Sequence, residues 1–422
     1  MSGIIELLAA AKSPPHIAAA LELLQFQSTP EGRVCSLSET EQQRFLRWCD
    51  DRQLTLMLSH VAKTRLPGWL RDSIAAKADR YELRFERIKR ELFQIVAALN
   101  GVNLPFLMLK GLSHSPALTP DPRLRAQGDI DLWLPESSIE KGRRILSNLG
   151  YVSLLGAKSR HLPPMTPQSN WKWRGDLYDP EMPISVELHY ELWSERTEYI
   201  RAPGLDQFWD RSVPREFDGH SIQVLCDEDL LGFAALHVLL HLLHGELPLQ
   251  RAWEIARFLD IHVADEVFWR RWRRSHPAAL RQLEVCIFRL VAAWFGCRWR
   301  EDFDSDVQSL PFMARSWLDK CPLKPVEREW KANKSEVSLH LALINNPLYE
   351  ICVLLRRLVP ISLPFFVDEG ASRPQWRMRL ARFRRQLPLF VRRFVLHAVT
   401  FLPTLFNGLC WFWTRISQAH RP

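Results

Sequence analysis

The sequence predicts an α+β fold, in which a small unit of strands and helices lies between an N-terminal and a C-terminal helical region. Residues 1–100 place apolar side chains at intervals of three and four residues, the spacing of one helical face. Between about 102 and 189, short apolar runs and alternating stretches typical of strands replace that spacing, and from about 227 it returns. We expect four parts, which are an N-terminal helical region at 1–100, an α/β core at 101–225, a C-terminal helical domain at 226–368 and an arginine-rich apolar tail at 369–422.

The N-terminal region contains three stretches with helical spacing. They are "SPPHIAAALELLQF", "ETEQQRFLRWCDDRQLTLMLSHVAKT" and "WLRDSIAAKADRYELRFERIKRELFQIVAALN". Residues that break helices separate them, as at Pro67-Gly68.

The predicted core begins with "VNLPFLMLKG", a short apolar run that we expect to be a buried strand closed by Gly111. The strand "GDIDLWL" and the helix "PESSIEKGRRILSNLG" follow, with Pro135 suited to the helix start and Gly150 to its end. "YVSLL" is the next expected strand. Residues 156–183, rich in Pro, Gly and polar side chains, form a long excursion before the alternating strand "ISVELHYEL".

The C-terminal domain returns to helices with "DEDLLGFAALHVLLHLLHG", "LQRAWEIARFLDIHV" and "DEVFWRRWRRSHPAALRQLEVCIFRLVAAWFG". A linker at about 300–330 leads to one more helical stretch and then to the tail. Residues 394–413 of the tail contain no charged residue and, as a helix, are long enough for a bilayer core. Residues 394–413 could span a membrane, lie on its surface, or pack as a buried C-terminal helix, and the segment 373–415 could contact an anionic membrane surface.

Charge and cysteine content narrow the class of protein. The net charge of +8 comes from residues 370–422, which hold ten arginines and no lysine or acid, and the rest of the chain holds 46 basic and 48 acidic residues. A near-neutral body argues against a nucleic-acid partner.

The eight cysteines form no Cys-x-x-Cys pair, which argues against a zinc ribbon or a disulfide framework. With no signal-peptide pattern at the start, we expect a cytoplasmic protein, peripheral on the cytoplasmic face of the membrane.

Two aspartates stand one residue apart in the strand "GDIDLWL". Because side chains alternate along a strand, Asp129 and Asp131 share one face while Ile130 and Leu132 take the other. Two carboxylates this close repel each other and raise each other's pKa unless a cation lies between them. Glu187 likewise shares a strand face with a histidine. The pattern indicates a site that needs water or a metal ion.

These residues belong to a longer pattern. "LMLKG", "RLRAQGDIDLWL", a helix, "LGY" and "VELHYEL" follow in order, and in them the chain resembles nucleotidyltransferases of the polymerase-β-like superfamily. The family pattern is a Lys-Gly turn, an Arg-x-x-Gly-Asp-x-Asp strand and a Val-Glu-Leu-His strand, and the resemblance extends more loosely from about 50 to 260. It implies a small mixed sheet as the nucleotidyltransferase core, which transfers NMP from an NTP to an acceptor and releases pyrophosphate.

The resemblance also implies roles for single residues. Asp129, Asp131 and Glu187 would hold Mg²⁺ (or Mn²⁺) and carry catalysis, Glu187 by helping to activate the acceptor. The positions that match the nucleotide-binding residues are Lys110, Gly111, Ser113, Arg125 and Gly128. Taken alone, Lys110 could be a surface lysine and Arg125 could pair with an acid, while the Glu187 strand could be a solvated edge.

Histidines complete the set of candidates. We expect His189 and His241 to support the metal ligands without binding the metal. His237, His241 and His244 share one helical face, but a zinc site there is disfavoured because all three lie on one helix and no fourth ligand is evident.

The predicted function is therefore a Mg²⁺-dependent nucleotidyltransferase. Its acceptor would be a sugar, a lipid-linked intermediate, a peptide or a protein. The alternative is a catalytically inactive nucleotide-binding or scaffold protein that the C-terminal tail recruits to the membrane. The presence of all three acids favours the enzyme.

Overall fold

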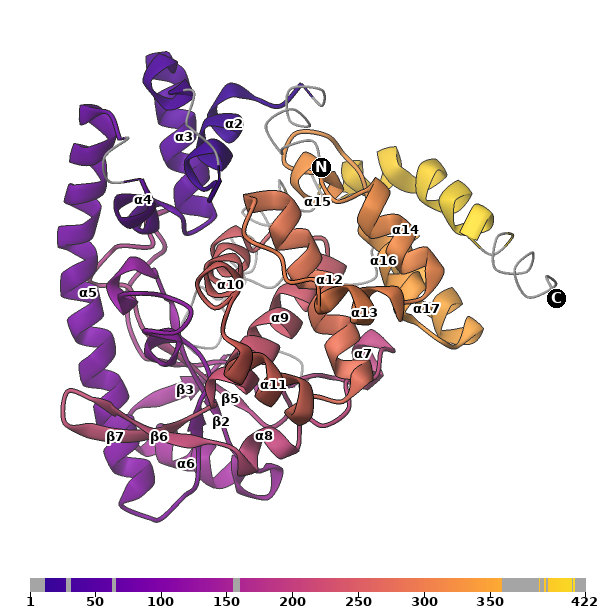
Figure 1. Cartoon of the computed structure of the whole chain (residues 1–422). Coiled ribbons are helices and arrows are strands. Elements are labelled where there is room, and N and C mark those ends of the chain that lie inside the picture. The colour runs from indigo at the N-terminus through magenta and orange to yellow at the C-terminus, as the bar shows by residue number, and fades with distance from the viewer. Residues whose placement is uncertain are drawn as a thin grey trace.

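The computed structural model describes residues 12–27, 32–62, 66–154, 160–358, 387, 391, 394–411 and 413. One seven-stranded mixed sheet lies at one end of the molecule, and helical regions precede and follow it along the chain (Figure 1). The predicted α+β class is confirmed. All eight cysteines are free, as expected.

The N-terminal helices are α2 (Pro15–Leu23), α3 (Glu39–Asp51), α4 (Thr55–Val61) and α5 (Gly68–Asn100), with a 3₁₀ turn at Arg33–Ser36. A capping box between Ser38 and Glu41 starts α3. The second predicted stretch divides into α3 and α4, because Gln53 between them adopts a left-handed conformation with φ 58°. The long helix α5 runs along the edge of the molecule from these helices to the sheet (Figure 1).

The sheet has the order β3-β4-β5-β2-β1-β7-β6. Its strands are β1 (Leu107–Met108), β2 (Asp129–Trp133), β3 (Tyr151–Ser153), β4 (Met165–Pro167), β5 (Ser185–His189), β6 (Val213–Phe217) and β7 (His220–Val224). The central strand β2 pairs in parallel with β5 and antiparallel with β1, so the sheet is mixed. Short 3₁₀ turns lie at Gly111–His114, Pro122–Leu124 and Glu136–Ser138, and the helix α6 (Ile139–Asn148) follows the last of them.

Three strands were not predicted. β4 lies within the excursion and pairs with β5 through Met165 and Val186. β6 and β7 form a hairpin at the far edge, joined by Asp218 and Gly219, which both have positive φ. Asp-Gly is a strong local signal for a hairpin, and the sequence analysis did not use it.

The two faces of the sheet have different surroundings. Ile130, Leu132, Val186 and Leu188 point to one side, into a core shared with α5 and α6. The alternate residues of β2 and β5 point to the opposite face, and Trp133 among them belongs to the core of the helical regions. The polar residues of β2 and β5 therefore lie between the sheet and the C-terminal helices.

The C-terminal helices form the second core. They are α7 (Glu195–Glu198), α8 (Gln207–Asp210), α9 (Asp227–Leu243), α10 (Leu249–Ile261), α11 (Glu266–Ser275), α12 (Ala278–Phe295), α13 (Phe303–Gln308), α14 (Phe312–Lys320), α15 (Lys324–Glu327), α16 (Glu336–Leu343) and α17 (Pro347–Leu358). Residues of α2, α3 and α4 join this core, while α5 packs on the sheet. The division of the chain at residues 100, 225 and 368 stays a prediction.

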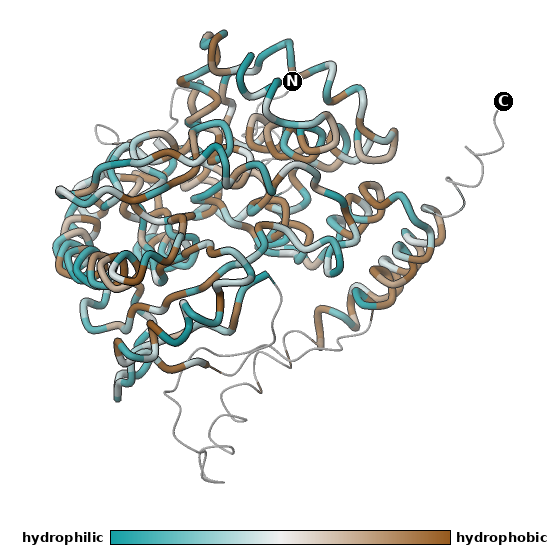
Figure 2. The backbone as a smooth tube through the Cα atoms, turned by 90° about the horizontal axis from the view of Figure 1, so that it is seen from below, coloured by the Kyte–Doolittle hydropathy of each residue, from teal (hydrophilic) through white to brown (hydrophobic). Residues whose placement is uncertain are grey.

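The tail helix, Phe394–Trp411, is long and apolar enough by length and composition to cross a membrane, with a mean hydropathy of 1.4. It packs on α17 through a stripe of mainly small and polar residues: Thr400 and Thr404 are buried, and a side chain at Gly408 would meet Leu354. Its outer face is apolar and exposed, including Leu402 (72%) and Phe406 (66%). Figure 2 shows this helix at the edge of the molecule. All ten arginines of the tail lie outside the described residues.

Candidate active site

An acidic cluster forms where β2 and β5 run side by side. The parallel register places Asp131 opposite Glu187, and His189 stands two residues further on the same face of β5. Ligand atoms of Asp131, Glu187 and His189 lie within 4.8 Å of one another. The sheet thus brings together side chains from segments more than fifty residues apart, a spacing at which a single metal ion could bind them.

Basic residues surround Asp131. Lys110 Nζ donates to Asp131 Oδ1 at 2.7 Å, and His189 Nε2 lies 2.8 Å from the same oxygen. Burial alone would raise the pKa of Asp131, but the charge of Lys110 and the hydrogen bonds outweigh burial and hold that pKa well below its usual value. Burial likewise opposes ionisation of Glu187, yet the hydrogen bond from His189 lowers the pKa of Glu187. Both carboxylates are therefore ionised at neutral pH.

Asp129 has the opposite electrostatic environment. It lies on the same strand face as Asp131 but outside the group that meets within 4.8 Å. Burial and the charge of Asp131 raise the pKa of Asp129 to about 6, since Lys110 and Arg251 compensate them only in part. Burial is the first cause of this shift, and Lys110, Arg160 and Arg251 supply positive charge near the acids. The two carboxylate side chains of Asp131 and Glu187, which meet at metal-ligand spacing, fit a divalent cation that prefers oxygen ligands.

The first part of the excursion adds a residue to the cluster. His161 forms a bridge with His189, next to the C-terminal end of β5, and its Nε2 lies 3.9 Å from Glu187 Oε2. The two imidazole rings lie 5.0 Å apart between centroids. The excursion thus places His161 beside the acidic cluster.

The turn after β1 holds the candidate phosphate-binding residues. Gly111 has φ 69°, a left-handed conformation that favours glycine, and a Cβ there would come within 2.6 Å of the end of the Gln127 side chain. Ser113 is fully buried and its hydroxyl donates to the Lys110 carbonyl oxygen at 3.2 Å, within its own turn. A side chain at Gly128 would meet nothing within 4 Å, so open space lies beside Asp129.

The segment that leads into β2 is fixed by α5. The hydroxyl of Tyr81 donates to the carbonyl oxygen of Arg125 at 2.6 Å and accepts from the backbone N–H of Gln127 at 3.0 Å. Tyr81 is 1% exposed. A buried tyrosine bonded on both sides holds the backbone just before Asp129 in one position.

The sequence left open whether Arg125 binds the nucleotide or pairs with an acidic residue. In the structure Arg125 pairs with an acidic residue. Its Nε lies 3.2 Å from Oε1 of Glu254 on α10, and both side chains are buried. Glu254 also accepts from Thr119 at 2.8 Å and lies 3.3 Å from His114. Arg125 therefore joins the segment before β2 to the C-terminal helices, and its role in nucleotide binding stays a prediction.

The three histidines at the end of α9 have different partners, and His244 directly follows the helix. His241 Nε2 lies 3.4 Å from His237, while His244 pairs with Glu198 at 3.0 Å. Within the described residues, none of these histidines belongs to a group of three or more ligand side chains whose atoms lie close enough together to share a metal ion. His241 contacts Glu246 and Arg251, so it lies next to the site rather than against the acids.

Arg251 was not predicted to belong to the site. It begins the inward face of α10, and its charge acts on both Asp129 and Asp131. The sequence signal was weak: "LQRAWEIARFLDI" places Arg251 one turn before Glu254, but the same helix also carries Arg257 and Asp260. Only the packing of α10 against the sheet shows which acids that charge faces.

The fold and the site define a class of protein: an α+β protein with acids on two neighbouring strands, a Lys-Gly turn beside them and helical regions around the sheet. The chain belongs to the family described as uncharacterised nucleotidyltransferase, whose model matches residues 38–296, more than half of the chain. No curated protein and no solved structure matches the chain. The resemblance found in the sequence is thereby confirmed at the level of the family.

Proposed function

We propose that this protein is a Mg²⁺- or Mn²⁺-dependent nucleotidyltransferase that moves NMP from an NTP to an acceptor. The acceptor is a sugar, a lipid-linked intermediate, a peptide or a protein. The observation that carries this proposal is the meeting of Asp131, Glu187 and His189 within 4.8 Å, beside Lys110. Family membership supports an NTP as the donor.

The reaction needs charge neutralisation and positioning more than covalent chemistry. An oxygen of the acceptor attacks the α-phosphorus of the NTP, the bond from that phosphorus to the α–β bridging oxygen breaks, and pyrophosphate leaves with the electron pair. Glu187, ionised beside His189, is placed to take the proton of the acceptor. A divalent ion held by Asp131 and Glu187, with Asp129 beside them, would supply Lewis-acid stabilisation of the transferring phosphoryl group.

The remaining cations have roles that match their positions. Lys110 neutralises the negative charge of Asp131 in their ion pair. Because its side chain is flexible, the ammonium group can turn to a phosphate of the NTP. The open space at Gly128 leaves room for a phosphate beside Asp129.

Removal of the metal tests the proposal. The full-length protein is incubated with each α-labelled NTP, Mg²⁺ or Mn²⁺, and cell extract as the source of acceptor. We expect the α-label in a product joined to the acceptor rather than in free NMP, and we expect EDTA to abolish it and added Mg²⁺ or Mn²⁺ to restore it. Nucleotide binding without any turnover, in both metals and with both soluble and membrane extract, would support the inactive scaffold instead.

We also infer that the tail helix lies on an anionic membrane surface. The helix packs on α17 with its small and polar side and leaves its apolar side exposed, the reverse of a helix that covers a water-soluble core. The arginines that precede it in the sequence provide the complementary charge for anionic lipid.

Substitutions on the exposed face test this inference. The double variant Leu402→Asp/Phe406→Asp should bind vesicles of anionic phosphatidylglycerol at least about a hundredfold more weakly, since each apolar side chain contributes roughly 1.5–3 kcal/mol on burial. Leu83→Asp, at a leucine equally exposed on α5, is the matched control and should bind as wild type. Cosedimentation measures both. Equal loss in the control, or binding to neutral phosphatidylcholine with the same strength, would contradict the inference.

A further inference from the structure

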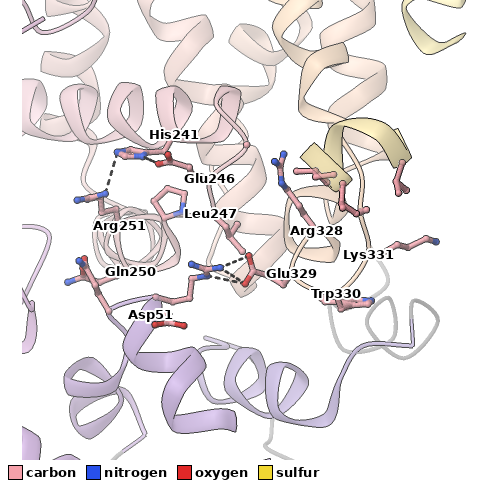
Figure 3. A pocket seen from close by; sticks show the side chains of 18 residues that line it. Asp51, His241, Glu246, Leu247, Gln250, Arg251, Arg328, Glu329, Trp330 and Lys331 are labelled. Atoms are coloured by element: carbon pink, nitrogen blue, oxygen red, sulfur yellow. Dashed lines mark hydrogen bonds and ion pairs between the residues drawn. The ribbon is translucent and has the colours of Figure 1, made fainter. Parts of the chain in front are cut away.

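A cavity of about 750 Å³ lies among the C-terminal helices, and Arg251 and His241 are part of its lining. It is bounded by residues 51–53 at the end of α3, the end of α9 with the start of α10 at 245–251, residues 328–332 and the tail helix (Figure 3). These segments are far apart in the sequence. The cavity is large enough for a ligand of drug size.

Most charges in the cavity are already balanced. Arg52 pairs with Glu329, Arg328 pairs with Glu336 outside the cavity, and His241 pairs with Glu246. Arg251 differs from them, because its buried Nε has no hydrogen-bond partner and its Nη1 lies 3.5 Å from His241. A buried guanidinium with an unused donor is costly unless a ligand accepts from it.

Arg251 also connects the cavity to the acids. Together with Lys110 and His237 it also lines a second, small gap. Arg251 therefore lines both the large cavity and a gap that it shares with Lys110, the residue that contacts Asp131. A group bound to Arg251 would stand on the side of the cavity that is nearest to the acidic cluster.

The opposite wall of the cavity is apolar. Val395, Leu396 and Val399 of the tail helix line it. They lie next along the tail helix to the exposed apolar residues that we infer to lie on the membrane. The cavity is thus cationic at Arg251 and apolar where the tail helix lines it.

We propose that this cavity binds the acceptor of the transfer reaction and that the acceptor is a phosphate-bearing amphiphile. The phosphate head accepts hydrogen bonds from Arg251 at the acidic end, and the hydrocarbon chain lies along Val395 and Val399 toward the lipid surface. This inference rests on the proposed function, since it names the acceptor class for that site. Arginine suits such a head because its planar donors match phosphate oxygens.

Calorimetric titration with dodecyl phosphate, below its micelle-forming concentration and without nucleotide or metal, tests the binding. We expect dodecyl phosphate to bind at least about tenfold more tightly than inorganic phosphate, because the chain buries apolar area. Arg251→Gln should weaken it about tenfold or more, and Arg251→Lys should restore part of the loss. Val399→Asp should weaken dodecyl phosphate but leave inorganic phosphate unchanged.

Exposed residues on α5 provide the matched controls. Arg90→Gln removes an arginine charge and Leu83→Asp places an acid at an apolar position, both away from the cavity. Both variants should bind dodecyl phosphate as tightly as wild type. Unchanged binding in both Arg251→Gln and Val399→Asp would overturn the inference. Inorganic phosphate binding as tightly as the amphiphile would also overturn it, in favour of a free phosphate site.

The transfer assay separates this inference from the proposed function. The labelled product should partition into chloroform–methanol. If label is found only in a water-soluble product, the protein transfers NMP as proposed, but the proposal that the acceptor is an amphiphile is wrong. A protein that binds dodecyl phosphate as expected and yet transfers no label would overturn the proposed function and the acceptor role, but not the site.

Discussion

Asp131→Asn is expected to lower nucleotidyl transfer by about 10³-fold or more, because it removes a charged oxygen ligand from the centre of the acidic cluster. Asp131 is the residue that Lys110 and His189 both contact and that Glu187 faces across the strand pair. Asparagine keeps the shape of the side chain but cannot supply the negative charge. The rate of label transfer with saturating NTP and metal measures the effect.

Asp72→Asn on the exposed surface of α5 is the matched control and should transfer label as wild type. The Asp131→Asn protein should remain folded by circular dichroism, and its affinity for Mn²⁺ should fall in parallel with activity. If the variant retains within tenfold of wild-type transfer, Asp131 is not a metal ligand and the assignment of this site is wrong.

Glu254→Ala is expected to destabilise the protein by about 3–5 kcal/mol, the effect of leaving a buried charge without its partner. Glu254 is 1% exposed and pairs with Arg125, Thr119 and His114 at the same time. Its removal therefore leaves several buried polar groups without their partner. Urea denaturation measures the free energy of unfolding. Glu140→Ala, which breaks an exposed ion pair with Arg143, should cost less than about 1 kcal/mol.

The same residue gives a pH dependence with a definite sign. Burial would raise the pKa of Glu254, but the charge of Arg125 and the bond with His114 lower it from 4.5 to about 2. A carboxyl with a lowered folded-state pKa stabilises the protein fully above 4.5, and this contribution is lost as the pH falls toward 2. Wild type should therefore lose more stability than Glu254→Ala between pH 5 and pH 3. Equal slopes would show that the pKa of Glu254 is not lowered in the folded protein.

The acids of the site were predictable from local pattern. Alternation along a strand placed Asp129 and Asp131 on one face and Glu187 with His189 on one face, and the structure has both arrangements. The Lys-Gly turn was predictable as well, since the left-handed backbone of Gly111 is a local requirement. Family resemblance connected these segments before any contact between them was known.

Other features depend on partners that no local pattern names. Arg125 could equally have faced a nucleotide, and its pairing with Glu254 follows from how α10 packs against the segment before β2. His189 lies within the acidic cluster itself, whereas the sequence suggested only support for it. The hairpin of β6 and β7 had a local signal in Asp218-Gly219, but its place beside β1 is a long-range pairing.

By itself, the sequence determined the α+β class, the faces that the acids occupy, and the apolar and basic character of the tail. Periodicity and composition are local properties, and each element expresses them wherever it packs. The tertiary structure decided that Asp131 stands opposite Glu187, that Arg251 lines a gap together with Lys110, and that the tail helix lines the same large cavity as Arg251. Strand register and helix docking are set by burial between distant segments, so only the folded chain shows them.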